Sequence, residues 1–78
     1  MRIYDQDNDK TISNVMLCLT KGEAIELMDS LKNILKINNR HEHISDEEYS
    51  HELTIFIYDM KMVESYDDRV RKVIIDDK

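Results

Sequence analysis

One segment constrains the fold of this 78-residue chain more than any other, the run from Thr20 to Ile37. Thr20 and Glu23 stand at the two positions of a capping box, in which each side chain bonds the backbone amide of the other residue. Apolar residues then recur every three or four positions and form one continuous stripe along a helix. We therefore expect a helix from about Lys21 to Ile37, with a stripe made of Ala24, Leu27, Met28, Leu31, Ile34 and Leu35.

Strands are expected on both sides of this helix. Arg2–Tyr4 and Ile12–Leu19 are predicted to pair as a hairpin, because the loop at 5–10 between them is rich in Asp and Asn. Leu53–Tyr58 alternates bulky side chains on both faces, which favours a strand at the centre of a sheet. The tail is ambiguous, because residues 66–75 fit a short helix and an edge strand equally well.

The order of these elements predicts an α+β fold. A small β-β-α-β sheet would carry the long helix on one face, with a short C-terminal helix or an edge strand added at the end. A chain of 78 residues makes one small domain, so we expect residues 1–78 to fold together. Such a domain buries roughly 60–65% of its surface and leaves little room for a deep active-site cavity.

The composition excludes several classes of function. Asp and Glu total 17 against 11 Lys and Arg, and this net charge of -6 argues against nucleic-acid binding and favours a basic protein partner. The longest apolar run, Val15 to Leu19, is too short to span a membrane. Cys18 is the single cysteine, so no internal disulfide can form, and a cytoplasmic location is expected.

Three histidines form the one cluster with the chemistry of a metal site. His41, His43 and His51 lie within eleven residues and have acidic neighbours. Imidazole and carboxylate groups bind zinc, manganese and iron. Side chains two residues apart on an extended segment, such as those of His41 and His43, point the same way. His51 would approach if a turn at 46–50 folded back. The favoured interpretation is nevertheless an exposed polar loop that binds no cofactor, because the zinc motif His-Glu-x-x-His is missing.

A second group of residues suggests binding to a protein. Tyr58, Met60, Met62 and Tyr66 follow one another closely after the last predicted strand. Methionine is common in adaptable interfaces and tyrosine in binding hot spots, so these four residues are the predicted partner-binding surface. No serine elbow or phosphate loop is present, and Cys18 lacks a local activating group, so we expect no enzyme activity.

The segment from Leu19 through the helix to His41-Glu42-His43-Ile44-Ser45-Asp46-Glu47-Glu48-Tyr49-Ser50 resembles small uncharacterised proteins of low-GC Gram-positive bacteria. The resemblance covers about half of the chain and implies a bacterial source, but no activity, ligand or site residue. The leading hypothesis is a non-catalytic protein–protein interaction or regulatory module, either antitoxin- or immunity-like or a homodimer. The alternative is a metal-binding or metal-sensing protein that uses His41, His43 and His51.

Overall fold

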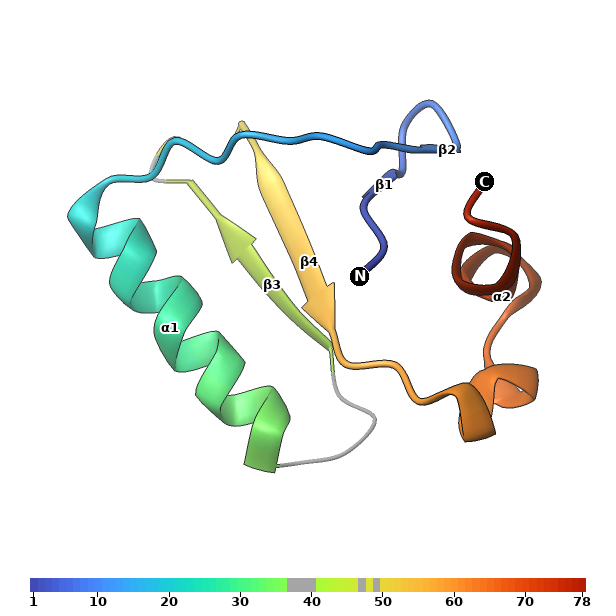
Figure 1. Cartoon of the computed structure of the whole chain (residues 1–78). Coiled ribbons are helices and arrows are strands. Elements are labelled where there is room, and N and C mark those ends of the chain that lie inside the picture. The colour runs from blue at the N-terminus through green and yellow to red at the C-terminus, as the bar shows by residue number, and fades with distance from the viewer. Residues whose placement is uncertain (37–40, 47, 49) are drawn as a thin grey trace. The chain divides into compact units, whose positions relative to one another are not determined.

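The structure is a computed structural model that describes residues 1–36, 41–46, 48 and 50–78. It is an α+β fold, as the sequence predicts (Figure 1). The chain divides into two compact units, which we call the terminal unit, residues 1–17 and 59–78, and the central unit, residues 18–58. The expectation of one domain over 1–78 stays a prediction, and each unit is described by itself.

The central unit begins with the long helix α1, Lys21–Lys36. Its start confirms the predicted capping box: the Thr20 amide donates to Glu23 Oε1 at 2.8 Å, and the Glu23 amide donates to Thr20 Oγ1 at 3.1 Å. Two amides that lack helical carbonyl partners are satisfied in this way, which fixes the first turn. The expected end near Ile37 lies outside the described residues.

Two antiparallel strands complete this unit, β3 at His41–Ser45 and β4 at Glu52–Phe56. β4 overlaps the predicted strand Leu53–Tyr58 but begins and ends earlier. In the described part of the chain it pairs with β3 only, so a central position is not observed. The segment that forms β3 was expected to belong to an exposed polar loop. It forms a strand because its backbone pairs with β4 over all five residues, and side-chain hydropathy carries no sign of this pairing.

One face of this hairpin packs against α1, as the fold class predicted. Ile44 on β3 and Ile34 on α1 are both buried, with 6% and 3% of their surface exposed. Leu53 and Ile55 lie on the same face of the sheet as Ile44 and are half-buried. α1 runs beside β3 in Figure 1, so the small core of the unit lies between the helix and this strand.

The terminal unit contains the predicted N-terminal hairpin in a shorter form. β1, Tyr4–Asp5, pairs with β2, Lys10–Thr11. Asp5 Oδ1 accepts from the amides of Asp7 and Asn8 at 3.1 and 3.2 Å and so closes the predicted turn. The strand expected over 12–19 is not formed among the described residues, and the strands make two separate two-stranded sheets instead of one.

The tail resolves into a helix instead of an edge strand. A 3₁₀ helix, η1, covers Met60–Ser65, and α2 covers Asp68–Asp76. Asp67 caps α2 by accepting from the amide of Val70 at 2.9 Å. The buried side chains of this region are Val63 on η1 and Val73 and Ile74 on α2.

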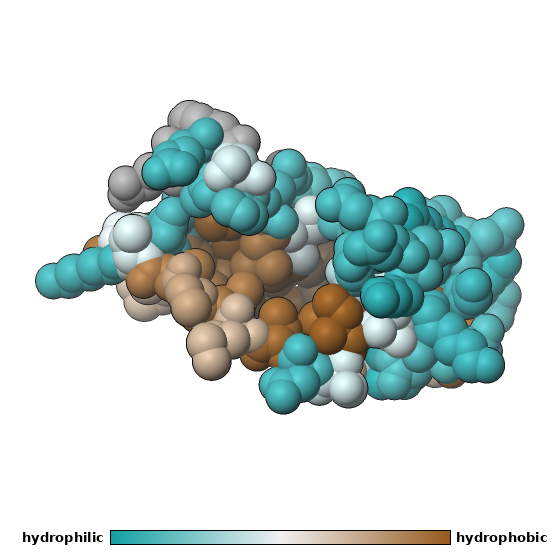
Figure 2. Space-filling view, turned by 90° about the horizontal axis from the view of Figure 1, so that it is seen from above, coloured by the Kyte–Doolittle hydropathy of each residue, from teal (hydrophilic) through white to brown (hydrophobic). Residues whose placement is uncertain are grey.

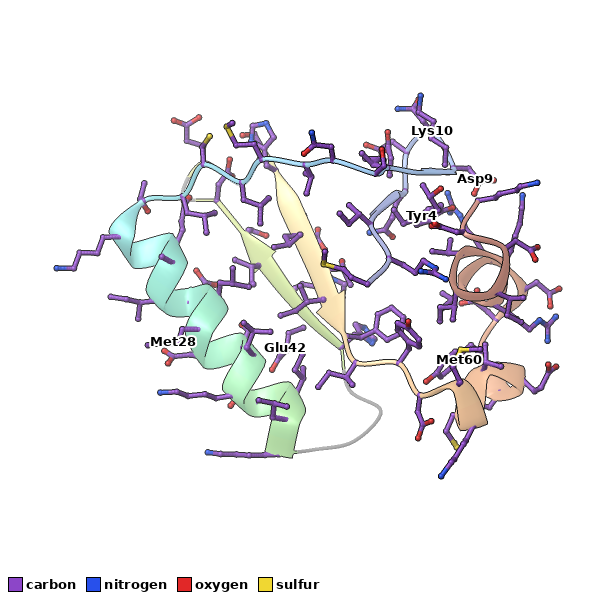
Figure 3. The ribbon with its side chains drawn as sticks, in the orientation of Figure 1. Tyr4, Asp9, Lys10, Met28, Glu42 and Met60 are labelled. Atoms are coloured by element: carbon purple, nitrogen blue, oxygen red, sulfur yellow. The ribbon has the colours of Figure 1, made fainter. Side chains whose placement is uncertain are left out.

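Polar contacts attach the N-terminal hairpin to α2. The Arg69 guanidinium donates to the Tyr4 hydroxyl and lies 5.1 Å from the centre of the Tyr4 ring. Thr11 Oγ1 donates to the Asp77 carbonyl at 2.7 Å. Figure 3 shows Tyr4 and Asp9 on the hairpin, where Tyr4 also donates to the Asp9 carboxylate. None of the described helices has the length and apolar character needed to cross a membrane.

Candidate functional site

The outer face of the β3–β4 hairpin carries two of the predicted site residues. His41 and His43 lie on the side of β3 opposite to Ile44, which faces α1. Their ring centroids are 4.9 Å apart and the rings are nearly perpendicular, at 83°. The prediction that these two side chains point the same way is therefore confirmed. We call them the β3 histidine pair.

His43 is held in place by residues of the neighbouring strand. Its Nδ1 lies 2.7 Å from Glu52 Oε1 and 2.8 Å from Thr54 Oγ1. Since a carboxylate only accepts, the proton of the neutral ring sits on Nδ1, between the imidazole and Glu52. The other ring nitrogen, Nε2, then keeps its lone pair for a further ligand.

His51 lies elsewhere on the hairpin, at the turn that joins the two strands. It is opposite Asp46, five positions along the strand from His41, which corresponds to about 16 Å. His51 Nδ1 lies 2.6 Å from Asp46 Oδ2, and the same carboxylate accepts from the amide of Ser50 at 2.8 Å. The predicted approach of His51 to the other two histidines is therefore not observed, although residues 47 and 49 of the expected turn lie outside the described part.

The Asp46–His51 contact shifts the proton affinity of both groups. The hydrogen bond to His51 lowers the pKa of Asp46 well below its usual value of 3.8, with further help from backbone amides. The same hydrogen bond, and the charge of the carboxylate, raise the pKa of His51 above 6.5. The His51 side chain is exposed and that of Asp46 is half-buried, so the contact joins the ends of the two strands without forming a closed site.

A metal site with three protein ligands is not present in the described structure. In residues 1–36, 41–46, 48 and 50–78 no group of three or more His, Cys, Asp or Glu side chains is placed to hold a metal ion. The hypothesis of a site built from His41, His43 and His51 together thus finds no geometric support. What the structure brings together is the β3 histidine pair alone.

The predicted partner-binding residues are divided between the two units. Met60 and Met62 are exposed on η1, as an interface would require. Tyr66 is half-buried, and its hydroxyl accepts from the Asp59 amide at 3.1 Å, so it supports η1 from within. Tyr58 is half-buried and belongs to the central unit.

Sequence reasoning missed an apolar surface on α1. The predicted stripe of six apolar residues is real, but the hairpin covers only its edge, where Ile34 is buried and Leu27 is half-buried. The remaining four side chains are exposed, Leu35 most of all, at 71%. We call them the α1 seam, which consists of Ala24, Met28, Leu31 and Leu35. Met28 is labelled on α1 in Figure 3. Exposed apolar side chains also occur outside α1, and Figure 2, seen from above, shows hydrophobic residues at the surface without singling out the seam.

Charge along the seam differs from that of the chain as a whole. Lys32 stands four residues after Met28 and three before Leu35, so it borders the seam, and Lys21 does the same three residues before Ala24. Within the described residues neither lysine forms an ion pair. The seam is therefore an apolar strip with a basic border in an acidic protein.

Comparisons give no match among protein-family models, curated proteins or solved structures. The functional argument therefore rests on the surfaces of the molecule. The described residues offer an exposed apolar seam on α1, a histidine pair on β3 and two exposed methionines on η1.

Proposed function

We propose that this chain is a non-catalytic protein-interaction module whose α1 seam binds an amphipathic helix of a partner protein. The observation that carries the proposal is the exposure of Met28, Leu31 and Leu35 on a helix that already packs against a sheet. Contiguous apolar surface of this kind on a protein marks an interaction site more often than scattered apolar residues do. The exposed methionine adds a side chain that adapts to an incoming surface.

The spacing of the seam supports a helical partner. Ala24, Met28, Leu31 and Leu35 follow one another at intervals of four, three and four residues, which is the spacing of the contact positions in a two-stranded coiled coil. These four residues extend over about three turns of α1 and present a straight row of apolar side chains along the helix. A partner helix with apolar residues at i, i+3, i+4 and i+7 fits this row.

The border of the seam supports a partner with acidic flanks. Lys21 and Lys32 have no carboxylate partner within the described residues, and a second helix would place its flanking side chains beside them. A second copy of this chain would bring the same lysines to that border, so a different protein is the better fit. The net charge of -6 favours a basic partner at long range. At physiological salt, charges are screened over about 8 Å, so the contacts at the border depend on the local charges, which are the two lysines.

Other parts of the proposal follow the sequence. We place the module in the cytoplasm, because its single cysteine allows no internal disulfide. We assign it no reaction, because neither the seam nor the turn at Asp46 and His51 combines a nucleophile with a base and an enclosed substrate position. An antitoxin-like or immunity-like role is compatible with such a module.

The experiment compares capture of proteins by matched variants. Tagged full-length chain carrying Leu31→Gln and Leu35→Gln is tested in bacterial lysate beside the wild type and an Ile75→Gln control. Ile75 serves as the control because it is an exposed apolar side chain on α2 that is not part of the seam. We expect one protein that the wild type and the control capture and the seam variant does not. A photocrosslinking residue placed at position 28 should form a crosslink to an acidic amphipathic helix of that protein. Equal capture by all three forms, or recovery of the chain's own copies alone, would contradict the proposal.

A further inference from the structure

We propose that the β3 histidine pair binds one borderline divalent transition-metal ion, of the class of Zn²⁺, Ni²⁺ and Cu²⁺, through His41 and His43 without His51. This inference is independent of the α1 seam, which lies on the opposite side of the hairpin from the pair. It replaces the three-histidine site predicted from the sequence with a two-residue site on one strand.

The backbone of β3 supplies the geometry of the site. His41 and His43 are two residues apart on a strand that is paired along its whole length with β4, so both side chains leave the same face of the sheet. Their rings approach each other to 4.9 Å between centroids. Both residues are exposed, so an ion reaches them from solvent and keeps water at its remaining positions.

The neighbouring strand supplies the support that metal-binding histidines usually have. A ligating imidazole commonly donates its second N–H to a carboxylate, which fixes the orientation of the ring and raises the basicity of the ligating nitrogen. Glu52 Oε1 stands 2.7 Å from His43 Nδ1, and Thr54 Oγ1 stands 2.8 Å from the same atom. His43 is thus held through Nδ1 with Nε2 left for the ion.

The donor atoms determine which ions fit. Two imidazole nitrogens suit zinc, nickel and copper, whereas calcium and magnesium require a cage of oxygen ligands. The described residues around the pair provide no such cage, which agrees with the finding that no set of three protein ligands is present there. We therefore expect weaker binding than at a closed structural site, with one ion for each chain.

His51 provides a matched control within the same hairpin. Like His43, it contacts a carboxylate through Nδ1, in this case that of Asp46. Unlike His43, it has no second histidine beside it among the described residues. Replacing His51 removes the same chemical group as replacing His43 and leaves the pair intact. The comparison therefore separates a site made by the pair from general affinity of surface histidines for metal.

The test is calorimetric titration of the untagged, metal-free full-length chain with Ni²⁺ and Zn²⁺. We expect one site per chain in the wild type and in His51→Ala, at least tenfold weaker binding in His41→Ala and in His43→Ala, and a smaller loss in Glu52→Gln. Circular dichroism of each variant checks that it is folded, and His41→Gln serves if His41→Ala is not.

An NMR titration gives a second readout, which locates the bound ion on individual histidines. Substoichiometric Cu²⁺ should broaden the ring signals of His41 and His43 before those of His51. Binding that survives both His41→Ala and His43→Ala, an equal loss in His51→Ala, or no binding to the wild type would each overturn the inference. The variant Leu35→Gln should bind metal as the wild type does, so failure of the proposed seam leaves this result unaffected.

Discussion

Two neighbouring residues of α1 should differ sharply in what their side chains contribute to stability. Ile34 is 3% exposed and lies against the hairpin, whereas Leu35 is 71% exposed and belongs to the seam. Both are aliphatic side chains of the same size on one turn of one helix. Replacing each with alanine therefore tests the orientation of α1, since the chemistry of the two changes is nearly the same.

The magnitudes follow from burial. Complete burial of an isoleucine side chain contributes roughly 1.5–3 kcal/mol, and its truncation to alanine also leaves a cavity, so Ile34→Ala should cost about 2–5 kcal/mol. Leu35 has little surface to lose from the protein interior, and alanine is the better helix former, so Leu35→Ala should change the free energy of unfolding by less than about 0.5 kcal/mol. The difference between the two variants is well above the error of a denaturation experiment.

The assay is urea denaturation followed by circular dichroism at 222 nm, with the midpoint and slope measured for each variant. If Ile34→Ala does not fold, Ile34→Val takes its place, with an expected cost of about 1 kcal/mol. A cost of 2 kcal/mol or more for Leu35→Ala would refute the reasoning, because it would mean that another part of the chain covers the seam. In that case the proposed interaction surface would be part of the protein's own core.

Three further predictions concern the contacts that define the local structure. Thr20→Ala should lower the free energy of unfolding by about 1 kcal/mol in the same assay through loss of the α1 cap, and Thr20→Ser should restore it. The raised pKa of His51 means that its contact with Asp46 stabilises the hairpin fully below pH 6.5 and is lost as the pH rises through the folded-state pKa. The lowered pKa of Asp46 means that its contribution is present above pH 3.8 and is lost on further acidification. The urea midpoint should therefore be highest between about pH 4 and 6.5, and His51→Gln should remove the alkaline part of this dependence. Tyr4→Phe should remove one of the contacts by which Arg69 holds the 6–9 loop, seen as faster proteolysis of that loop, while Tyr66→Phe should leave the loop unchanged.

The parts of the fold that the sequence predicts well are those determined by local contacts. The start of α1 depends on Thr20 and Glu23, which are three residues apart, and both predicted hydrogen bonds are present. The first hairpin depends on Asp5 and the amides that follow it. Such contacts involve neighbours in the chain, so residue type and spacing are enough to predict them.

The parts that the sequence predicts poorly depend on partners distant in the chain. β3 contains a single apolar residue, Ile44, and its other four residues are polar. Nothing in that pattern indicates a strand, because the stabilising contacts come from the backbone of β4. The opposite error occurs over 12–19, where the apolar alternation predicts a strand but no ladder forms among the described residues. Alternation shows that a segment can form a strand and does not supply its partner.

The histidines illustrate the same limit at the level of a site. Period-two alternation correctly places His41 and His43 on one face, because that property belongs to a single strand. The position of His51 depends on the register between β3 and β4, which the sequence does not determine. A register in which Asp46 closes the turn moves His51 away from the pair and gives it a carboxylate of its own.

The α1 seam links one sequence pattern to folding and to the proposed recognition of a partner. The stripe of α1 is wider than the surface that the hairpin covers, since two strands about 4.8 Å apart are no wider than the helix itself. The described hairpin therefore buries one edge of the stripe, around Ile34, and leaves the other edge, around Leu35, exposed. A buried serine, Ser30, marks where the covered face extends beyond the apolar stripe, and so shows that α1 is rotated away from the orientation that would bury most apolar surface. A helix rotated in this way keeps a core contact on one side and presents Met28, Leu31 and Leu35 to a second helix on the other, which is the arrangement that an interaction module requires.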